Sequence, residues 1–242
     1  MQRNRKIKNL KFNYIGITMS LDLTKIKQFP LSESQYYKEA VDKKQIVLHH
    51  TAGNASAVNV MQNWNVDDRG RIATCVSISG PGAKNSADGE IVQGFSSKHW
   101  AYHLGIKQEV FRAYKVPHQV IDRIAIGIEI CNWGQLDLVG GKYINYVDRE
   151  VAADQVTTLA TPYKGYTHFH RYSDAQIESV RELLIYWSET HGIDLKYDYD
   201  QMFTVNTKAL TGTNGLYSHN SYRKDKIDIY PCPRMITMLK TL

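Results

Sequence analysis

Two adjacent histidines, His49 and His50, close a short apolar run in the first quarter of the chain. Residues 45–50 read Gln-Ile-Val-Leu-His-His, and turn-forming residues follow at 51–54. This pattern predicts a buried strand, in which successive side chains point to opposite faces. Only one of the two imidazoles can therefore face a given site. Taken alone, the pair is more typical of buried structural histidines than of a metal site.

A second group of reactive side chains lies near the other end of the chain. His219 is followed nine positions later by Asp228, and Lys226 stands two positions before the aspartate. Imidazole and carboxylate are ordinary ligands of Zn²⁺, at about 2.0–2.2 Å, and alternate residues of an irregular loop can face the same way. Cys232, between two prolines, is a further possible ligand. Taken alone, this loop fits a solvated charged turn equally well.

The elements that must position these residues alternate between strands and helices. The clearest helix begins at a capping-box pattern at Ser173, carries apolar side chains at helical spacing and ends near Gly192. The segment 134–165 shows no clear period and is interpreted as an insertion, and His168 and His170 are interpreted as loop residues. The predicted elements are strands at 45–50, 72–79, 90–93 and 124–130, and helices at 55–65 and 173–190. This order indicates an α/β domain with a single mixed central β-sheet flanked by helices.

One charge interrupts the apolar strand at 124–130. This residue is Glu129, and a carboxylate inside an apolar strand is costly unless it is paired or has a chemical role. A carboxylate near an attacking water can take its proton and pass it to a departing amine. A fixed cation such as Lys226 can stabilise the oxyanion of a tetrahedral intermediate. The simpler alternatives are an ion pair between Glu129 and Arg123, and a surface lysine in a charge-rich loop.

Composition limits the kind of protein. The chain has 242 residues, a net charge of +6 and three cysteines without close spacing. No apolar stretch reaches the roughly 18 residues of a membrane span, so no transmembrane segment is expected, and the cysteines support neither a disulfide framework nor a Cys-x-x-Cys metal site. The positive charge favours an anionic partner, whether nucleic acid, membrane surface or cell-wall polymer. We expect a basic N-terminal extension over residues 1–40, with poor signal-peptide character, and one domain over 41–242.

Four segments of the chain form a pattern in a fixed order. They are residues 46–53 (Ile-Val-Leu-His-His-Thr-Ala-Gly), 100–105 (Trp-Ala-Tyr-His-Leu-Gly), 126–129 (Ile-Gly-Ile-Glu), and His219 with Lys226-Ile227-Asp228 and Pro231. Together they resemble the type 2 N-acetylmuramoyl-L-alanine amidases, a superfamily of cell-wall recycling amidases, phage endolysins and peptidoglycan recognition proteins. The resemblance covers most of the chain and implies the fold of that superfamily.

The resemblance implies a Zn²⁺ site held by His49, His219 and Asp228. Cys232 is the competing third ligand, because a thiolate replaces the aspartate in part of the family. Two imidazoles and one carboxylate leave the fourth tetrahedral position open for water, which is the coordination of a catalytic zinc site.

The resemblance also implies roles for residues around the metal. Glu129 is expected to be the catalytic base, and Lys226 to stabilise the oxyanion. His103 and Trp100 are expected to line the substrate groove, with a buried packing role as the alternative for Trp100. His50 is expected to be structural, because it faces away from His49.

Two residues depart from the family pattern. Thr74 stands where members resembling phage lysozyme have a catalytic tyrosine, and Cys75 stands where a histidine is common. The recycling-amidase branch instead uses a glutamate on the Ile-Gly-Ile-Glu strand, and Glu129 supplies it. The pattern therefore favours a glutamate-based subtype.

These observations lead us to expect a zinc-dependent peptidoglycan hydrolase that cleaves the amide between N-acetylmuramic acid and L-alanine. We expect a monomer, made in a host or bacterial cytoplasm and acting on the cell wall after release, with no nucleic-acid partner. One alternative is a peptidoglycan recognition module of the same fold without hydrolysis, which typically lacks a zinc ligand. The other is a basic nucleic-acid-binding protein, which leaves the set His49, His219 and Asp228 unexplained.

Overall fold

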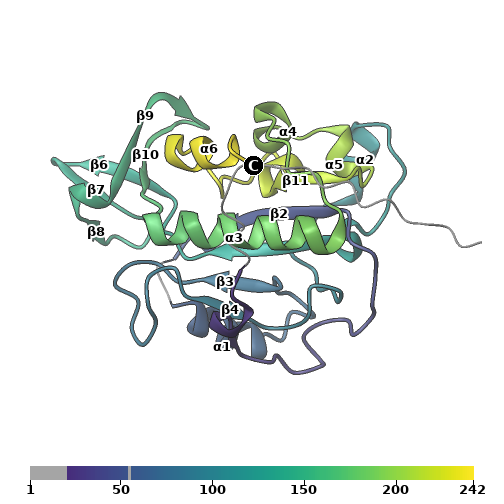
Figure 1. The fold of residues 1–242 in the computed structure, drawn as a ribbon. Helices are drawn as coiled ribbons and strands as arrows, with labels where there is room; N and C mark the ends of the chain where they lie inside the picture. The colour runs from purple at the N-terminus through teal and green to yellow at the C-terminus, as the bar shows by residue number, and fades with distance from the viewer. Residues whose placement is uncertain (1–20, 54–55) are drawn as a thin grey trace, which may run out of the picture.

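The computed structural model describes residues 21–53 and 56–242, which form a central sheet, a second smaller sheet and surrounding helices (Figure 1). The central sheet has six strands in the order β1-β4-β3-β5-β2-β11. Strand β2 pairs in parallel with both β5 and β11, whereas β4 is antiparallel to β3. The strands are β1 (Lys27–Gln28), β2 (Gln45–His50), β3 (Val76–Ile78), β4 (Ile91–Gln93), β5 (Ala125–Ile130) and β11 (Gly215–Ser218). The predicted α/β class with a mixed central sheet is confirmed.

Helices lie on both sides of the central sheet, and α3 runs along it across the front of the view (Figure 1). The helices are α1 (Ala57–Asn65), α2 (Gln108–Ala113), α3 (Asp174–His191), α4 (Tyr199–Phe203), α5 (Thr207–Leu210) and α6 (Pro233–Leu239). Short 3₁₀ turns occur at Leu23–Lys25, Ile121–Ile124, Ala153–Gln155 and His219–Ser221. None of the helices in the described part of the chain is long and apolar enough to span a lipid bilayer.

Helix α3 begins and ends where the sequence predicts. The Ser173 and Gln176 side chains form the capping box, and Gly192 closes the helix in the left-handed conformation at φ 67°. The apolar stripe faces the core, and the buried members are Ile177, Val180, Leu183, Leu184 and Trp187. Each such side chain contributes roughly 1.5–3 kcal/mol by burial, so packing rather than helix propensity anchors α3 to the sheet.

The segment predicted to be an insertion without a clear period folds as a five-stranded antiparallel sheet, called the second sheet below. Its strands are β6 (Gln135–Val139), β7 (Lys142–Ile144), β8 (Glu150–Val151), β9 (Val156–Tyr163) and β10 (Tyr166–His170). The prediction of a loop at His168 and His170 is wrong, because both residues lie in β10. The sequence pattern conceals the second sheet because β9 is mostly exposed, with Leu159 as its buried residue.

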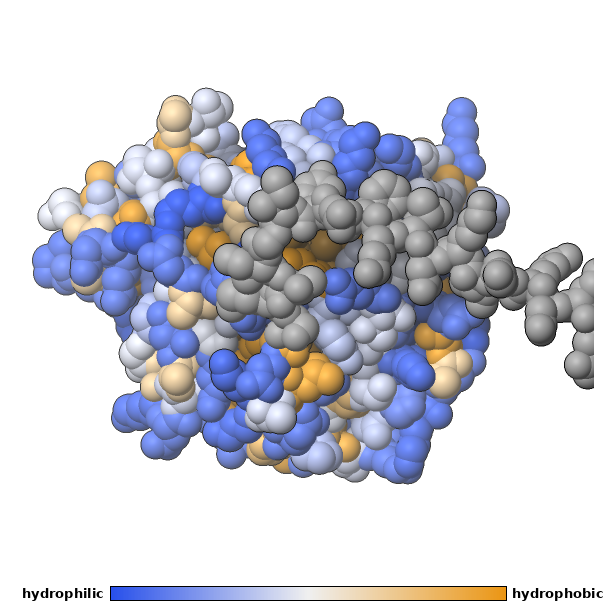
Figure 2. Space-filling model, viewed as in Figure 1, coloured by the Kyte–Doolittle hydropathy of each residue, from blue (hydrophilic) through white to orange (hydrophobic). Residues whose placement is uncertain are grey.

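The second sheet projects from one end of the central sheet (Figure 1). Figure 2 shows the same face, where hydrophilic residues predominate and apolar residues form small separate patches. Residues 21–40, predicted to be part of the N-terminal extension, contribute β1 to the central sheet and the buried Leu31 to its core. Residues 1–20, which hold the basic cluster, lie outside the described residues. The domain boundary at residue 40 stays a prediction.

Candidate active site

The candidate site lies where three parallel strands end. In β2, His49 is the direct neighbour of Glu129 in β5, and residues paired across parallel strands present their side chains on the same face. On the other side of β2, strand β11 ends at Ser218, which pairs with Leu48, so His219 follows at the level of His49. The carboxyl ends of parallel strands are the usual place for a ligand site in an α/β protein.

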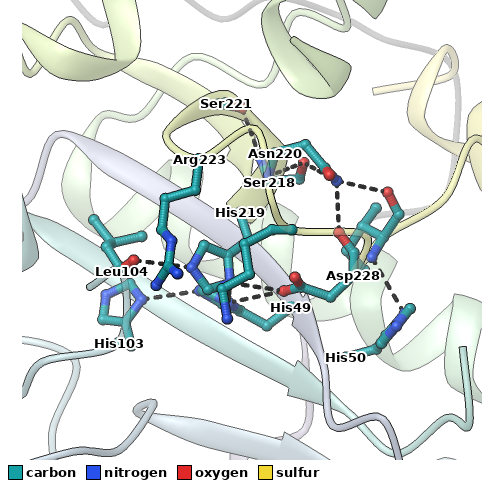
Figure 3. Close-up of polar contacts among 12 residues, drawn as sticks. His49, His50, His103, Leu104, Ser218, His219, Asn220, Ser221, Arg223 and Asp228 are labelled. Atoms are coloured by element: carbon teal, nitrogen blue, oxygen red, sulfur yellow. Dashed lines mark hydrogen bonds and ion pairs between the residues drawn. The ribbon is translucent and has the colours of Figure 1, made fainter. Parts of the chain in front are cut away.

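Three ligand atoms form a compact triangle at this edge (Figure 3). His49 Nδ1 lies 3.1 Å from His219 Nδ1 and 3.3 Å from Asp228 Oδ2, and His219 Nδ1 lies 2.9 Å from the same oxygen. A regular tetrahedron with metal–ligand distances of about 2.0–2.1 Å has edges of about 3.3–3.4 Å. The triangle therefore resembles one face of a zinc coordination tetrahedron, with edges slightly shorter than the ideal ones.

The remaining ring nitrogens fix the orientation of both imidazoles. His219 Nε2 lies 2.9 Å from the carbonyl oxygen of Leu104, which can only accept, so this nitrogen carries the proton and Nδ1 presents a lone pair to the triangle. His49 Nε2 lies 2.9 Å from His103 Nδ1, which can accept the proton of His49 Nε2 when His49 Nδ1 binds a metal. With both protons on the Nε2 atoms, the three triangle atoms would present lone pairs to a divalent cation, which would stabilise this arrangement.

Burial and charge keep His49 and Asp228 in metal-binding protonation states near neutral pH. Burial lowers the pKa of His49 to about 4, so the ring is neutral. Burial would raise the pKa of Asp228, but the neighbouring His219 and His49 hold this pKa well below its usual range. The site thus offers the neutral imidazole of His49 and the carboxylate of Asp228, which are the forms that bind zinc.

Glu129 differs in its ionisation from Asp228. Burial raises the pKa of Glu129 well above its usual range, the negative charge of Asp228 adds to this rise, and Lys226 opposes it. A carboxyl group with a raised pKa is a stronger base than an ordinary carboxylate, which suits a group that takes up a proton and later passes it on.

A cavity of about 400 Å³ opens over the triangle. Seven residues singled out from the sequence line it together: His49, His50, His103, Glu129, His219, Lys226 and Asp228. The fold therefore gathers at one place residues that are up to 179 positions apart, as the span from His49 to Asp228 shows.

Trp100 does not line this cavity. Its side chain is 6% exposed, its ring stacks on Tyr37 with 3.9 Å between ring centroids, and its indole N–H donates to Glu39 at 2.8 Å. This geometry corrects the expectation of a sugar contact, because both partners of the indole come from the segment before β2 and leave little surface for a ligand. Trp100 therefore has the buried packing role predicted as the alternative to a substrate contact.

Cys232 also lies away from the triangle. It is fully buried at the start of α6, within the apolar core, whereas Asp228 faces the two imidazoles. His50 is buried, and strand alternation turns its side chain to the face of β2 opposite that of His49, although the residue also borders the cavity. Its Nδ1 accepts the backbone N–H of Ile229 at 3.2 Å and lies 2.8 Å from the hydroxyl of Tyr172. His50 therefore supports the backbone next to Asp228.

Two residues that support the backbone around the site were not predicted from the sequence. The buried carboxylate of Asp122 accepts the backbone N–H groups of His103 at 2.7 Å and Leu104 at 2.9 Å. Asn220 Nδ2 donates to the carbonyl oxygen of Asp228 at 2.6 Å. No spacing or motif marks these two residues, because their partners are backbone groups that only the tertiary fold brings near.

A glycine makes room for the imidazole of His103. An added Cβ on Gly127 would lie 2.7 Å from Cγ2 of Thr74 and 3.2 Å from Nδ1 of His103. These distances are shorter than ordinary van der Waals contacts, so the Gly in Ile-Gly-Ile-Glu is required by the packing of the site.

Comparisons with known proteins give the following similarities. The family model described as N-acetylmuramoyl-L-alanine amidase matches residues 39–233. No curated protein matches the chain. The chain is similar to the solved structure of PlyL, at 13% identity over 88% of this chain and 89% of that one, with a TM-score of 0.46. It is also similar to a mutant endolysin from Bacillus subtilis (16% identity, 89% and 96% covered, TM-score 0.47) and to AmpD (13%, 89% and 95%, 0.46).

Proposed function

Because the chain belongs to the N-acetylmuramoyl-L-alanine amidase family, we propose that it is a zinc-dependent peptidoglycan hydrolase that cleaves the amide between N-acetylmuramic acid and L-alanine. The observation that carries the zinc dependence is the triangle of His49 Nδ1, His219 Nδ1 and Asp228 Oδ2, with edges of 2.9–3.3 Å. Its orientation by Leu104 and His103 supports a prearranged metal site. A bound Zn²⁺ would act as a Lewis acid that polarises the scissile carbonyl and lowers the pKa of water.

The protein's own groups supply the proton transfers. Glu129 lies on the same face of the sheet as His49 and lines the same cavity. Its raised pKa suits a residue that takes a proton from the attacking water and returns it to the departing amine. Lys226, also in the cavity wall, stabilises the negative charge that develops on the carbonyl oxygen.

The substrate would occupy the cavity above these groups. His103 forms part of the wall, and its Nε2 has no hydrogen-bond partner among the described residues. We propose that the side chain of His103 contacts the stem peptide or the sugar from this wall. The net charge of +6 suits a cell-wall polymer that carries carboxylates. We place the activity at the cell wall, carried out by a monomer after release from the cytoplasm in which it is made.

Metal analysis and mass spectrometry of digested muropeptides test this function together. We expect close to one zinc per chain, and products in which the stem peptide has been released with a free L-alanine amino group. His49→Ala should lose the zinc and the cleavage, whereas Cys232→Ser, in the buried core, should retain both. Muropeptide binding without cleavage by the zinc-loaded protein would favour a recognition module instead. Full cleavage by zinc-free protein would refute the metal mechanism.

A further inference from the structure

The second sheet reaches the site through the tip of one hairpin. Strands β9 and β10 are joined by Lys164 and Gly165, between the paired residues Tyr163 and Tyr166. Both joining residues have positive φ, 49° and 89°, as in a type I′ turn. Asparagine, aspartate or glycine is preferred at the first of these positions. A lysine at this position is therefore unfavourable for the turn.

The Lys164 ammonium group contacts the segment that carries Asp228 and Lys226. We call residues 222–229 the ligand loop. Lys164 Nζ donates to the carbonyl oxygen of Lys224 at 3.3 Å, to the carbonyl oxygen of Lys226, and to Oδ1 of Asn220 at 2.7 Å. An ammonium group has three donors, and these contacts provide an acceptor for each of them.

Asn220 continues this connection to the proposed zinc ligand. While its Oδ1 accepts from Lys164, its Nδ2 donates to the carbonyl oxygens of Asp228 at 2.6 Å and Ile229 at 2.9 Å. Figure 3 shows Asn220 above Asp228, with the dashed contacts that join them. The amide of Asn220 thus transmits the position of the hairpin tip to the backbone of Asp228.

The backbone that follows Asp228 needs such support. Ile229 has φ 59°, a left-handed conformation that is strongly disfavoured for a β-branched residue. A residue persists in this conformation where its surroundings fix it. Here Asn220 holds the carbonyl group of Ile229 and His50 holds its N–H. Lys164 fixes the loop on the other side of Asp228.

We infer that Lys164 is a positioning residue, which holds the ligand loop so that Asp228 completes the metal triangle and Lys226 faces the cavity. A segment of the second sheet, outside the four family-like motifs, therefore takes part in forming the site. The consequences for catalysis and zinc affinity rest on the proposed function, whereas the consequence for loop order does not.

The test compares Lys164→Met with Lys142→Met. Methionine keeps the aliphatic chain at the hairpin tip and removes the three donors. Lys142, on β7 of the same second sheet, pairs with Glu150 at 2.7 Å, so its replacement makes the same charge change away from the loop. Hydrogen exchange of the metal-free proteins measures loop order, and competition with a chelator measures zinc affinity.

For Lys164→Met we expect faster exchange confined to residues 222–229 and zinc binding weakened about 10-fold, the lower end for residues that support metal ligands. With muropeptide as substrate, kcat should fall and KM should change little, because the loop carries chemical groups. Lys164→Arg should recover most of the zinc affinity, and Lys142→Met should match the wild type throughout.

Two results would overturn the inference. One is wild-type exchange and zinc affinity in Lys164→Met. The other is faster exchange spread over both sheets, which would mean that Lys164 stabilises the fold in general. A wild-type protein that binds zinc tightly and cleaves no muropeptide would refute the proposed function, and the exchange and affinity results would still decide the role of Lys164.

Discussion

Replacing Glu129 by glutamine separates its chemical role from its structural one. Glutamine keeps the shape of the side chain and one acceptor oxygen, and it cannot take up a proton at neutral pH. Loss of a general base typically costs about 10²–10⁴-fold in rate, which corresponds to roughly 3–5 kcal/mol in the activation free energy. Because Glu129 is not in the ligand triangle, the zinc content should stay unchanged.

The same substitution should stabilise the metal-free protein at high pH. Burial raises the folded-state pKa of Glu129 well above its usual value, so ionised Glu129 destabilises the fold. The sign follows from linkage: stability is intact below the unfolded-state pKa of about 4.3 and is lost as the pH rises through the folded-state pKa. Glutamine removes this loss. We therefore expect Glu129→Gln to have a higher melting temperature than the wild type at pH 8 and a similar one at pH 4.

Three measurements on each protein test this prediction: kcat on purified muropeptide, zinc per chain, and thermal unfolding of the metal-free form at both pH values. Glu178→Gln is the matched control, because Glu178 is an exposed residue of α3 that pairs with Arg181 at 3.1 Å. It should leave all three quantities near wild type. A Glu129→Gln enzyme with kcat within a few-fold of wild type would refute the assignment of the base.

Three further predictions follow from particular contacts. Asp228→Ala should abolish zinc binding and muropeptide cleavage, whereas Cys232→Ser should retain both, as metal analysis and product analysis can show; the reverse result would make the thiolate the third ligand. Gly127→Ala should lower the free energy of unfolding by about 1–3 kcal/mol in urea titrations, because its Cβ would lie 2.7 Å from Cγ2 of Thr74, and Thr74→Ser should restore part of this stability. Burial lowers the pKa of His170 to about 4, so stability should fall between about pH 6.5 and pH 4, by on the order of 3 kcal/mol from this residue. His170→Asn, which cannot take up that proton, should reduce the pH dependence measured by urea unfolding, and an unchanged dependence would contradict the reasoning.

The parts of the fold that follow from local patterns could be predicted from the sequence. The apolar run before His49 predicts β2 with the boundaries observed, and the capping box at Ser173 predicts the start of α3. Side-chain alternation in β2 also separates His49, on the site face, from His50, on the other. These features depend on neighbours in sequence, so periodicity and capping reveal them.

The second sheet could not be predicted in the same way. A strand with one buried face shows alternating polarity, but β9 buries one residue, Leu159, and exposes most of the others. The prediction that Trp100 lines the substrate groove was wrong for a related reason. Its stacking partner Tyr37 and its acceptor Glu39 lie about 60 positions earlier in the chain, in a segment read as an extension. Motif spacing can single out a residue, but it does not show which distant segments pack over that residue.

The arrangement around the triangle explains why so many residues without a recognisable motif are needed to hold the site. His49 Nδ1, His219 Nδ1 and Asp228 Oδ2 lie within 3.3 Å of one another, and burying three such polar side chains costs desolvation free energy. A left-handed Ile229 adds backbone strain beside them. These unfavourable features persist because contacts from other elements restrain each group, among them Asn220 on the loop and the Leu104 carbonyl behind His219. The family motif marks the residues proposed to do the chemistry. The residues that restrain them are scattered along the chain, and their partners are mostly backbone atoms. The sequence therefore reveals the chemical residues and does not reveal the restraining ones.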